Sequence, residues 1–208
     1  MPQELRRRVG STTGTPDCWL FPSTGCIVGD MATFSDDSLN SGVQEIKRGI
    51  DVTLENECFA SCAILIYSAI DLMAYLGMPE KQLDVTGKDF QEWADRYIHF
   101  PCKEQLSGVD LWAARCGMMH NYGPRSRLVR EGKARNIVYA DHQIPEIRFN
   151  PSIATDVVIV SVRAMRDALF HAIDRYLVDL FYESEKARVA ETRLDWVIKV
   201  IELRKDET

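Results

Sequence analysis

The segment from Glu57 to Leu76 constrains the fold more than any other part of the sequence. Its residues, ECFASCAILIYSAIDLMAYL, are apolar on nearly every side of a helix, and Gly77 and Pro79 end that helix. A helix of this kind cannot lie on a surface, so the segment predicts a central helix surrounded by others. Asp71 lies inside it among apolar neighbours. We expect this carboxylate to bond to a neighbouring helix, with Arg115 as a candidate partner, and a catalytic role is the alternative.

Helical patterns continue on both sides of this central segment. Residues 40–54 repeat apolar side chains at the spacing of one helix face, and a capping box starts another helix at Thr86. Two further helices are expected, from residue 155 or 156 to about 182 and from 184 to about 203. Between residues 136 and 149, two short runs with β-branched or aromatic residues, NIVYA (136–140) and EIRF (146–149), flank a turn and predict a hairpin. The predicted fold class is all-α, a helical bundle with a small β-hairpin insertion.

The start of the chain differs from the rest. Residues 1–36 are rich in Gly, Ser, Thr and Pro and show no helical or strand period. They are predicted to be a poorly ordered extension, and residues 37–208 the helical domain. No apolar run is expected to approach the roughly 18 residues of a membrane span, and no secretion signal is recognised. We therefore expect a cytoplasmic protein with no membrane partner.

A second helical segment, SGVDLWAARCGMMHNYG, runs from Ser107 to Gly123, and a capping box of Ser107 and Asp110 is predicted to start it. The segment carries very few ionisable groups. Between Leu111 and Tyr122, apart from the thiol of Cys116, only the side chains of Arg115 and His120 can carry a charge below pH 9. At 100° per residue, Arg115 shares one stripe with Leu111, Met118 and Tyr122, which predicts a guanidinium among core side chains. Burying an unpaired charge is very costly, so Arg115 requires anionic or carbonyl partners. This combination marks the segment as a candidate site.

The residues that follow this segment are strongly basic, although the whole chain carries a net charge of −6. Between residues 125 and 135, five basic side chains face one acidic side chain, Glu131, which gives a local charge of +4. Two interpretations stay open: a surface that binds the RNA backbone, or a solvated loop. The residues assigned to RNA binding under the first are Arg125, Arg127, Arg130, Lys133 and Arg135.

The spacing of Arg115, His120 and Tyr122 is R-x4-H-x-Y, and this resembles the motif of the HEPN superfamily (higher eukaryotes and prokaryotes nucleotide-binding). A chance R-x4-H match is expected about 0.3 times in such a composition, and the longer match about 0.01 times. The resemblance implies a HEPN-like helical bundle and a metal-independent ribonuclease, as in toxins and defence effectors. It also implies a homodimer that joins two such sites, no cofactor or metal, and a nucleotidyltransferase-type antitoxin that modifies Tyr122. In the family the residue after the arginine is commonly Asn, Asp or His, whereas here it is Cys116.

The chemistry that the resemblance implies assigns a role to two of the three motif residues. RNA carries its own nucleophile, the 2′-hydroxyl, so cleavage needs a proton-transfer group, for which His120 is suited. It also needs a cation for the charge that builds on the phosphoryl oxygens, for which Arg115 is suited. The predicted catalytic residues are therefore Arg115, His120 and Tyr122. Two alternatives stay open: a core arginine beside a helix-capping histidine, and a non-catalytic HEPN-like module that binds a nucleotide or a protein.

A second R-x4-H match, Arg166 to His171, lies in the long helix expected near residues 156–182. His171 has Asp167 four residues before it and Asp174 three residues after it, which is typical of a solvated, ion-paired helix face. We therefore predict no catalytic role for this second pair.

Overall fold

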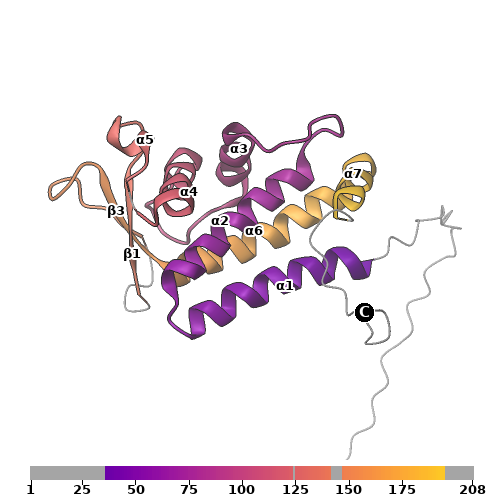
Figure 1. Cartoon of the computed structure of the whole chain (residues 1–208), viewed down its shortest axis with the longest axis horizontal. Coiled ribbons are helices and arrows are strands. Elements are labelled where there is room, and N and C mark those ends of the chain that lie inside the picture. The colour runs from indigo at the N-terminus through magenta and orange to yellow at the C-terminus, as the bar shows by residue number, and fades with distance from the viewer. Residues whose placement is uncertain (1–35, 124, 142–146, 195–208) are drawn as a thin grey trace, which may run out of the picture. The chain divides into compact units, whose positions relative to one another are not determined.

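The structure is a computed structural model that describes residues 36–123, 125–141 and 147–194 (Figure 1). The predicted N-terminal extension lies outside these residues except for Asp36, where the first helix begins. The end of the last predicted helix, from residue 195 on, also lies outside them. The described part is mainly helical, as predicted. Its elements are α1 (Asp36–Glu55), α2 (Phe59–Gly77), α3 (Gly87–Tyr97), α4 (Gly108–Asn121), α5 (Arg127–Arg130), β1 (Asn136–Ala140), β2 (Ile147–Arg148), β3 (Val157–Ser161), α6 (Val162–Tyr182) and α7 (Ser184–Leu194).

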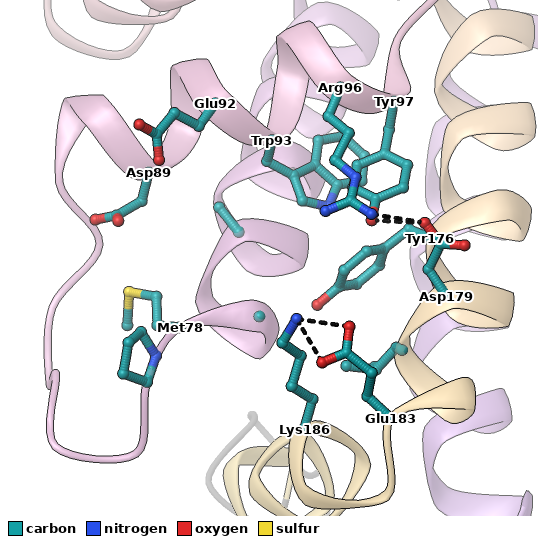
Figure 2. Close-up of a pocket in the computed structure, with 14 residues that line it drawn as sticks. Met78, Asp89, Glu92, Trp93, Arg96, Tyr97, Tyr176, Asp179, Glu183 and Lys186 are labelled. Atoms are coloured by element: carbon teal, nitrogen blue, oxygen red, sulfur yellow. Dashed lines mark hydrogen bonds and ion pairs between the residues drawn. The ribbon is translucent and has the colours of Figure 1, made fainter.

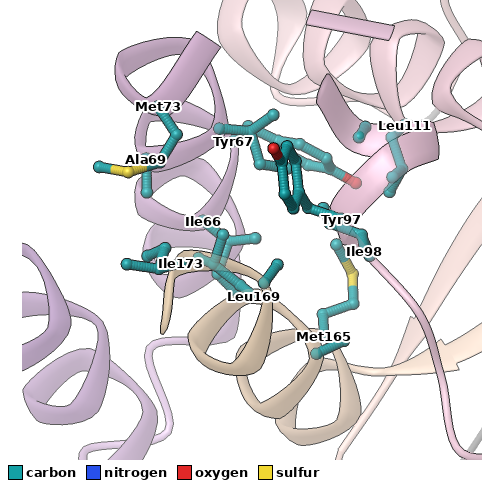
Figure 3. Close-up of a cluster of buried hydrophobic side chains, with 14 of the residues drawn as sticks. Ile66, Tyr67, Ala69, Met73, Tyr97, Ile98, Leu111, Met165, Leu169 and Ile173 are labelled. Atoms are coloured by element: carbon teal, nitrogen blue, oxygen red, sulfur yellow. The ribbon is translucent and has the colours of Figure 1, made fainter. Parts of the chain in front are cut away.

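The apolar segment that begins near residue 57 is the central helix of the fold. α2 contacts α1, α3, α4, α6 and α7, and Figure 1 shows α1 on one side of the α2–α6 pair and α3 and α4 on the other. At its middle, buried side chains of α2 meet those of α6 and α4, as Figure 3 shows for Ile66, Tyr67, Leu111, Leu169 and Ile173. The prediction that this helix is central is confirmed.

The expectation that no segment has the length of a membrane span needs correction. Residues Phe59–Gly77 form a helix of 19 residues with a mean hydropathy of 1.8, long and apolar enough to cross a membrane by composition. Half of that stretch is buried inside the fold, and five other helices contact it. Its hydrophobicity is therefore accounted for by its position in the core.

The predicted hairpin is wrong, because its two strands do not pair with each other. β1 has the predicted bounds, but it pairs in parallel with β3, from Asn136 opposite Val157 to Ala140 opposite Ser161. β2 pairs antiparallel with the other edge of β3, so the sheet has the order β1-β3-β2. The sequence VVIVS of β3 was predicted to be the first turns of the long helix. Its β-branched side chains favour a strand, and a short apolar run fits either period.

The long helix therefore begins later than predicted, at Val162. Ser161 is its N-cap, and the Ser161 side chain accepts a hydrogen bond from the backbone N–H of Ala164 at 3.3 Å. Its end at Tyr182 agrees with the prediction. The start of α3 also agrees, because Thr86 and Asp89 form the expected capping box.

Three aromatic rings join α3 to the C-terminal half of α6 (Figure 2). Tyr176 lies edge-on to Trp93 and Tyr97, with ring centroids 5.6 and 5.2 Å away. Rings at these separations and angles attract each other beyond the area that they bury. The cluster therefore fixes the position of α3, against which α4 packs.

Candidate functional site

The predicted site helix is α4, and its start is held from several directions. Ser107 Oγ accepts from the Asp110 backbone N–H at 3.2 Å, and the Asp110 carboxylate accepts from the Ser107 N–H at 3.0 Å, so the predicted capping box is confirmed. Gly108 permits a close approach to α3, since a Cβ there would lie 2.3 Å from the backbone oxygen of Gln91. These contacts fix the axis of α4 relative to α3.

Arg115 forms an ion pair with Asp71 of the central helix, as the sequence predicted. Its Nε donates a hydrogen bond to Asp71 Oδ2 at 3.0 Å, and its Nη2 lies 2.9 Å from the same oxygen. Its guanidinium lies 5.0 Å from the ring centroid of Trp112. The side chains are 22% and 24% exposed, so the pair is largely but not fully shielded from water. Burial raises the pKa of Asp71, and the attraction of Arg115 offsets part of that rise. The arginine is thereby held in one orientation.

The other two motif residues are exposed at the end of α4. His120 lies in the last helical turn, and Tyr122 caps the helix in the left-handed conformation, at φ 51° and ψ 28°. The tyrosine side chain is 69% exposed, so the prediction that Tyr122 shares a buried stripe with Leu111 and Met118 is wrong. The helix ends at Asn121, and the left-handed backbone conformation of Tyr122 takes its side chain out of the helical stripe that faces the core.

Among the described residues of one chain, no hydrogen bond or ion pair joins Arg115, His120 and Tyr122 to one another. Arg115 is turned towards Asp71, whereas His120 and Tyr122 face solvent. This agrees with ideal helix geometry, in which residues five apart lie about 140° from each other around the axis. Any reaction that uses both Arg115 and His120 therefore needs either a second chain or a substrate that spans the two groups.

An apolar cavity next to Tyr122 was not predicted. It has a volume of about 330 Å³ and is bounded by side chains of α2, α4 and β1. One wall contains Tyr139, whose hydroxyl makes a hydrogen bond of 2.6 Å with the hydroxyl of Tyr67. The residues that line it are Phe59, Ala60, Met118, Tyr122, Ile137, Val138 and Tyr139. The β-branched and aromatic residues of β1 indicated a strand but not which helix ends it would meet.

The basic segment after α4 contains two kinds of side chain. Arg125, Arg127, Arg130 and Lys133 are exposed, and two of them pair with Glu131 on the surface, Lys133 at 2.8 Å and Arg127 at 3.7 Å, whereas the fifth basic residue is held by the fold. The three arginines and Lys133 therefore present positive charge to solvent beside the end of α4.

Arg135 differs from the other basic residues, because acidic groups of the fold hold it. Its Nη2 donates to Asp110 at 2.7 Å, its Nη1 pairs with Glu104, and its guanidinium lies 5.4 Å from the ring centroid of Phe149. Burial raises the pKa of Asp110, but hydrogen bonds from Arg135 and Ser107 outweigh this and lower the pKa below its ordinary value. Arg135 was predicted to bind RNA. We leave it out of the RNA-binding surface, because phosphate would have to displace a buried carboxylate.

The second R-x4-H pair lies on an ion-paired face, as expected. Arg166 donates to Asp51 of α1 and to Asp167 at 2.8 Å each, and its guanidinium lies 4.0 Å from the ring centroid of Phe170. His171 is exposed, and its neighbour Asp174 pairs with Lys47 instead. Arg166 therefore serves the packing of α1 on α6.

Within residues 36–123, 125–141 and 147–194, no three His, Cys, Asp or Glu side chains are placed to hold a metal ion. Comparison of the chain with protein-family models, with curated proteins and with solved structures gives no match.

Proposed function

We propose that the chain is a metal-independent endoribonuclease of the HEPN type, acting in the cytoplasm as a toxin or defence effector. The observation that carries the proposal is that one helix, otherwise nearly free of ionisable groups, holds both an Arg115 anchored by Asp71 and an exposed His120. The experiment that tests it is RNA cleavage by the purified protein in EDTA, compared with the His120→Ala variant.

In the proposed reaction the 2′-oxygen of RNA attacks the adjacent phosphorus and the bond to the 5′-oxygen breaks. His120 removes the proton of the 2′-hydroxyl, and a protonated group, the partner's histidine or water, supplies the leaving oxygen with its proton. Arg115 stabilises the charge on the phosphoryl oxygens through its planar donors. The product ends in a 2′,3′-cyclic phosphate.

The reaction is proposed to take place in a two-fold homodimer formed through the end of α4. Three apolar side chains there are exposed: Met119 at 40%, Tyr122 at 69% and Val138 at 40%. Burying them between two chains would be favourable, and two-fold dimers are the commonest closed assemblies. We expect light scattering to give the mass of a dimer at micromolar concentration, and Tyr122→Asp to shift it towards the monomer. A monomer that retains activity would refute this assembly.

RNA is proposed to bind along the exposed arginines beside α4. Replacing Arg125, Arg127 and Arg130 by Ala is expected to weaken binding of single-stranded RNA and to reduce the slope of log K against log salt by up to about 2, since each phosphate contact contributes roughly 0.7. Fluorescence anisotropy over a salt series measures this slope.

The control for that experiment replaces three exposed basic residues on other elements, namely Arg48 of α1, Lys88 of α3 and Arg163 of α6. It removes the same total charge but leaves the end of α4 intact. If both triple variants lower the slope equally, the segment from residue 125 to 130 has no special part in binding and is a solvated loop.

A non-catalytic HEPN-like module that binds a nucleotide or a protein is the second candidate. The ion pair with Asp71 favours it, because that contact gives Arg115 a structural role that needs no substrate.

For the enzyme, the proposed partner is a nucleotidyltransferase-type antitoxin that modifies Tyr122. The exposure of that hydroxyl-bearing side chain supports this partner.

A further inference from the structure

A second cavity lies on other elements, between the end of α2, α3, the end of α6 and the start of α7 (Figure 2). Its volume is about 260 Å³, and no residue of α4 lines it. This is far more than the roughly 10–15 Å³ that one water molecule needs. Figure 2 shows Tyr176 reaching towards the middle of the cavity, with Asp89 and Glu92 on the opposite side.

Two buried donors in its wall have no hydrogen-bond partner among the described residues. These are Trp93 Nε1 and the hydroxyl of Tyr176, on side chains that are 6% and 5% exposed. Buried donors without a partner are rare in folded proteins, and leaving one unpaired is costly. Indole N–H groups only donate, so whatever satisfies Trp93 must offer an acceptor.

A comparison with Tyr97 shows that the lack of a hydrogen-bond partner is particular to Tyr176 and not common to the tyrosines of this cluster. Tyr97 lies in the same aromatic cluster and is equally buried, but its hydroxyl donates to Asp179 Oδ2 at 3.0 Å. The hydroxyl of Tyr176 instead points at the end of α2. A Cβ at Gly77 would lie 2.9 Å from it, so the absence of a side chain there leaves room for the hydroxyl.

The charged side chains around the cavity favour a cation. The wall contains four carboxylates and two cationic side chains, a formal charge of −2 (Asp89, Glu92, Asp179, Glu183, Arg96, Lys186). Asp179 and Glu183 are paired with Arg96 and Lys186. Glu92 pairs with Lys88 at 3.5 Å, and both side chains are mostly exposed, so this contact is weak and easily exchanged.

We propose that this cavity binds a small organic cation that also carries a hydrogen-bond acceptor. Its positive group pairs with Glu92 at the rim, and its acceptor receives the hydrogen bonds of Trp93 and Tyr176 in the wall. The site is independent of RNA cleavage at α4, and its size limits the ligand to about that of an amino-acid derivative.

The test uses the full chain and three probes in saturation-transfer NMR. L-argininamide carries cationic groups and a carbonyl acceptor, agmatine carries the same kinds of cation without the carbonyl, and valeramide carries the carbonyl without a cation. L-argininamide is expected to bind, agmatine about 5- to 10-fold more weakly for want of the acceptor, and valeramide not at all. Absence of L-argininamide binding, or equal binding of agmatine, overturns the proposal.

Tyr176→Phe and Tyr97→Phe form a matched pair of variants. Tyr176→Phe removes an unpaired hydroxyl, so it is expected to leave the Tm of the free protein unchanged or higher while weakening L-argininamide binding about 5-fold or more. Tyr97→Phe breaks a hydrogen bond and is expected to lower Tm by about 1–6 °C, which gives the cost in this cluster of losing a tyrosine hydroxyl that has a partner. If Tyr176→Phe lowers Tm as much as Tyr97→Phe, the hydroxyl is held by fixed water, and the cavity is a hydration site.

Glu92→Gln tests the charge at the rim. It keeps the shape of the side chain and is expected to weaken L-argininamide binding about 3-fold or more at low salt, with the loss shrinking as salt is raised. Binding that is unchanged at every salt concentration overturns the assignment of a cation site.

Discussion

Replacing His120 by alanine is expected to abolish metal-independent RNA cleavage, since proton transfer by a positioned group contributes about 10²–10⁴-fold to the rate. Within the described residues the side chain of His120 makes no hydrogen bond or ion pair and is exposed in the last turn of α4, so its removal should not disturb the fold. A loss of activity without a change in Tm would therefore report on the reaction itself.

The measurement is cleavage of mixed RNA by purified protein in EDTA, with the products analysed for 2′,3′-cyclic phosphate ends. His171→Ala is the matched control, because His171 is also an exposed helical histidine five residues after an arginine. It is expected to keep full activity. Equal activity of the native protein and His120→Ala would point to a contaminant or another site, and no activity in any form would favour the non-catalytic module.

Arg115 requires a separate comparison, because its side chain is also structural. Arg115→Ala is expected to reduce cleavage by about 10²–10³-fold through loss of a charge-stabilising donor. It also leaves Asp71 half-buried without its partner, so a fall in stability would accompany the loss. Asp71→Asn keeps the guanidinium but loosens its anchor. A large fall in activity for Arg115→Ala and a small one for Asp71→Asn would assign the charge itself to the reaction.

The largest effect on stability is expected from Arg193→Ala. This arginine of α7 is 6% exposed and donates to four backbone carbonyl oxygens in the last turn of α2 and the loop after it. The distances are 2.6 Å to Tyr75 and Met78, 2.7 Å to Pro79 and 3.0 Å to Gln82. Removing the arginine side chain would leave the carbonyls of Met78 and Gln82 without a donor among the described residues, while those of Tyr75 and Pro79 each keep a backbone N–H. Together with the lost packing of a buried side chain, this is expected to lower the free energy of unfolding by about 3–4 kcal/mol. A chain of this length would lose about 6–16 °C in Tm.

The control for this variant is Arg188→Ala on the same helix. Arg188 pairs with Glu80 and Glu185 on the surface, with its side chain 52% exposed, so its loss is expected to change Tm little. Thermal unfolding followed by circular dichroism measures both. Similar Tm values for the two variants would contradict the prediction that the hydrogen bonds of Arg193 stabilise the packing of α7 against the end of α2.

Local patterns in the sequence determined much of the helical framework. The apolar residues of α2 required a central position because no single face could be left in water. The capping boxes at Thr86 and Ser107 fixed two helix starts, since each needs only side chains three residues apart. The Asp71–Arg115 pair was also predictable, because each was a lone charge on an apolar helix that needed a partner.

Only the tertiary structure decided which segments meet. VVIVS reads equally as a strand or as a helix turn, and its choice depends on β1 and β2 being present to pair with it. Arg135 was one of five basic residues in the sequence, and the position of Asp110 at the start of α4 separates it from the rest. The unpaired hydroxyl of Tyr176 follows from the end of α2 lying against α6, because hydrogen-bond satisfaction depends on neighbours far apart in the chain.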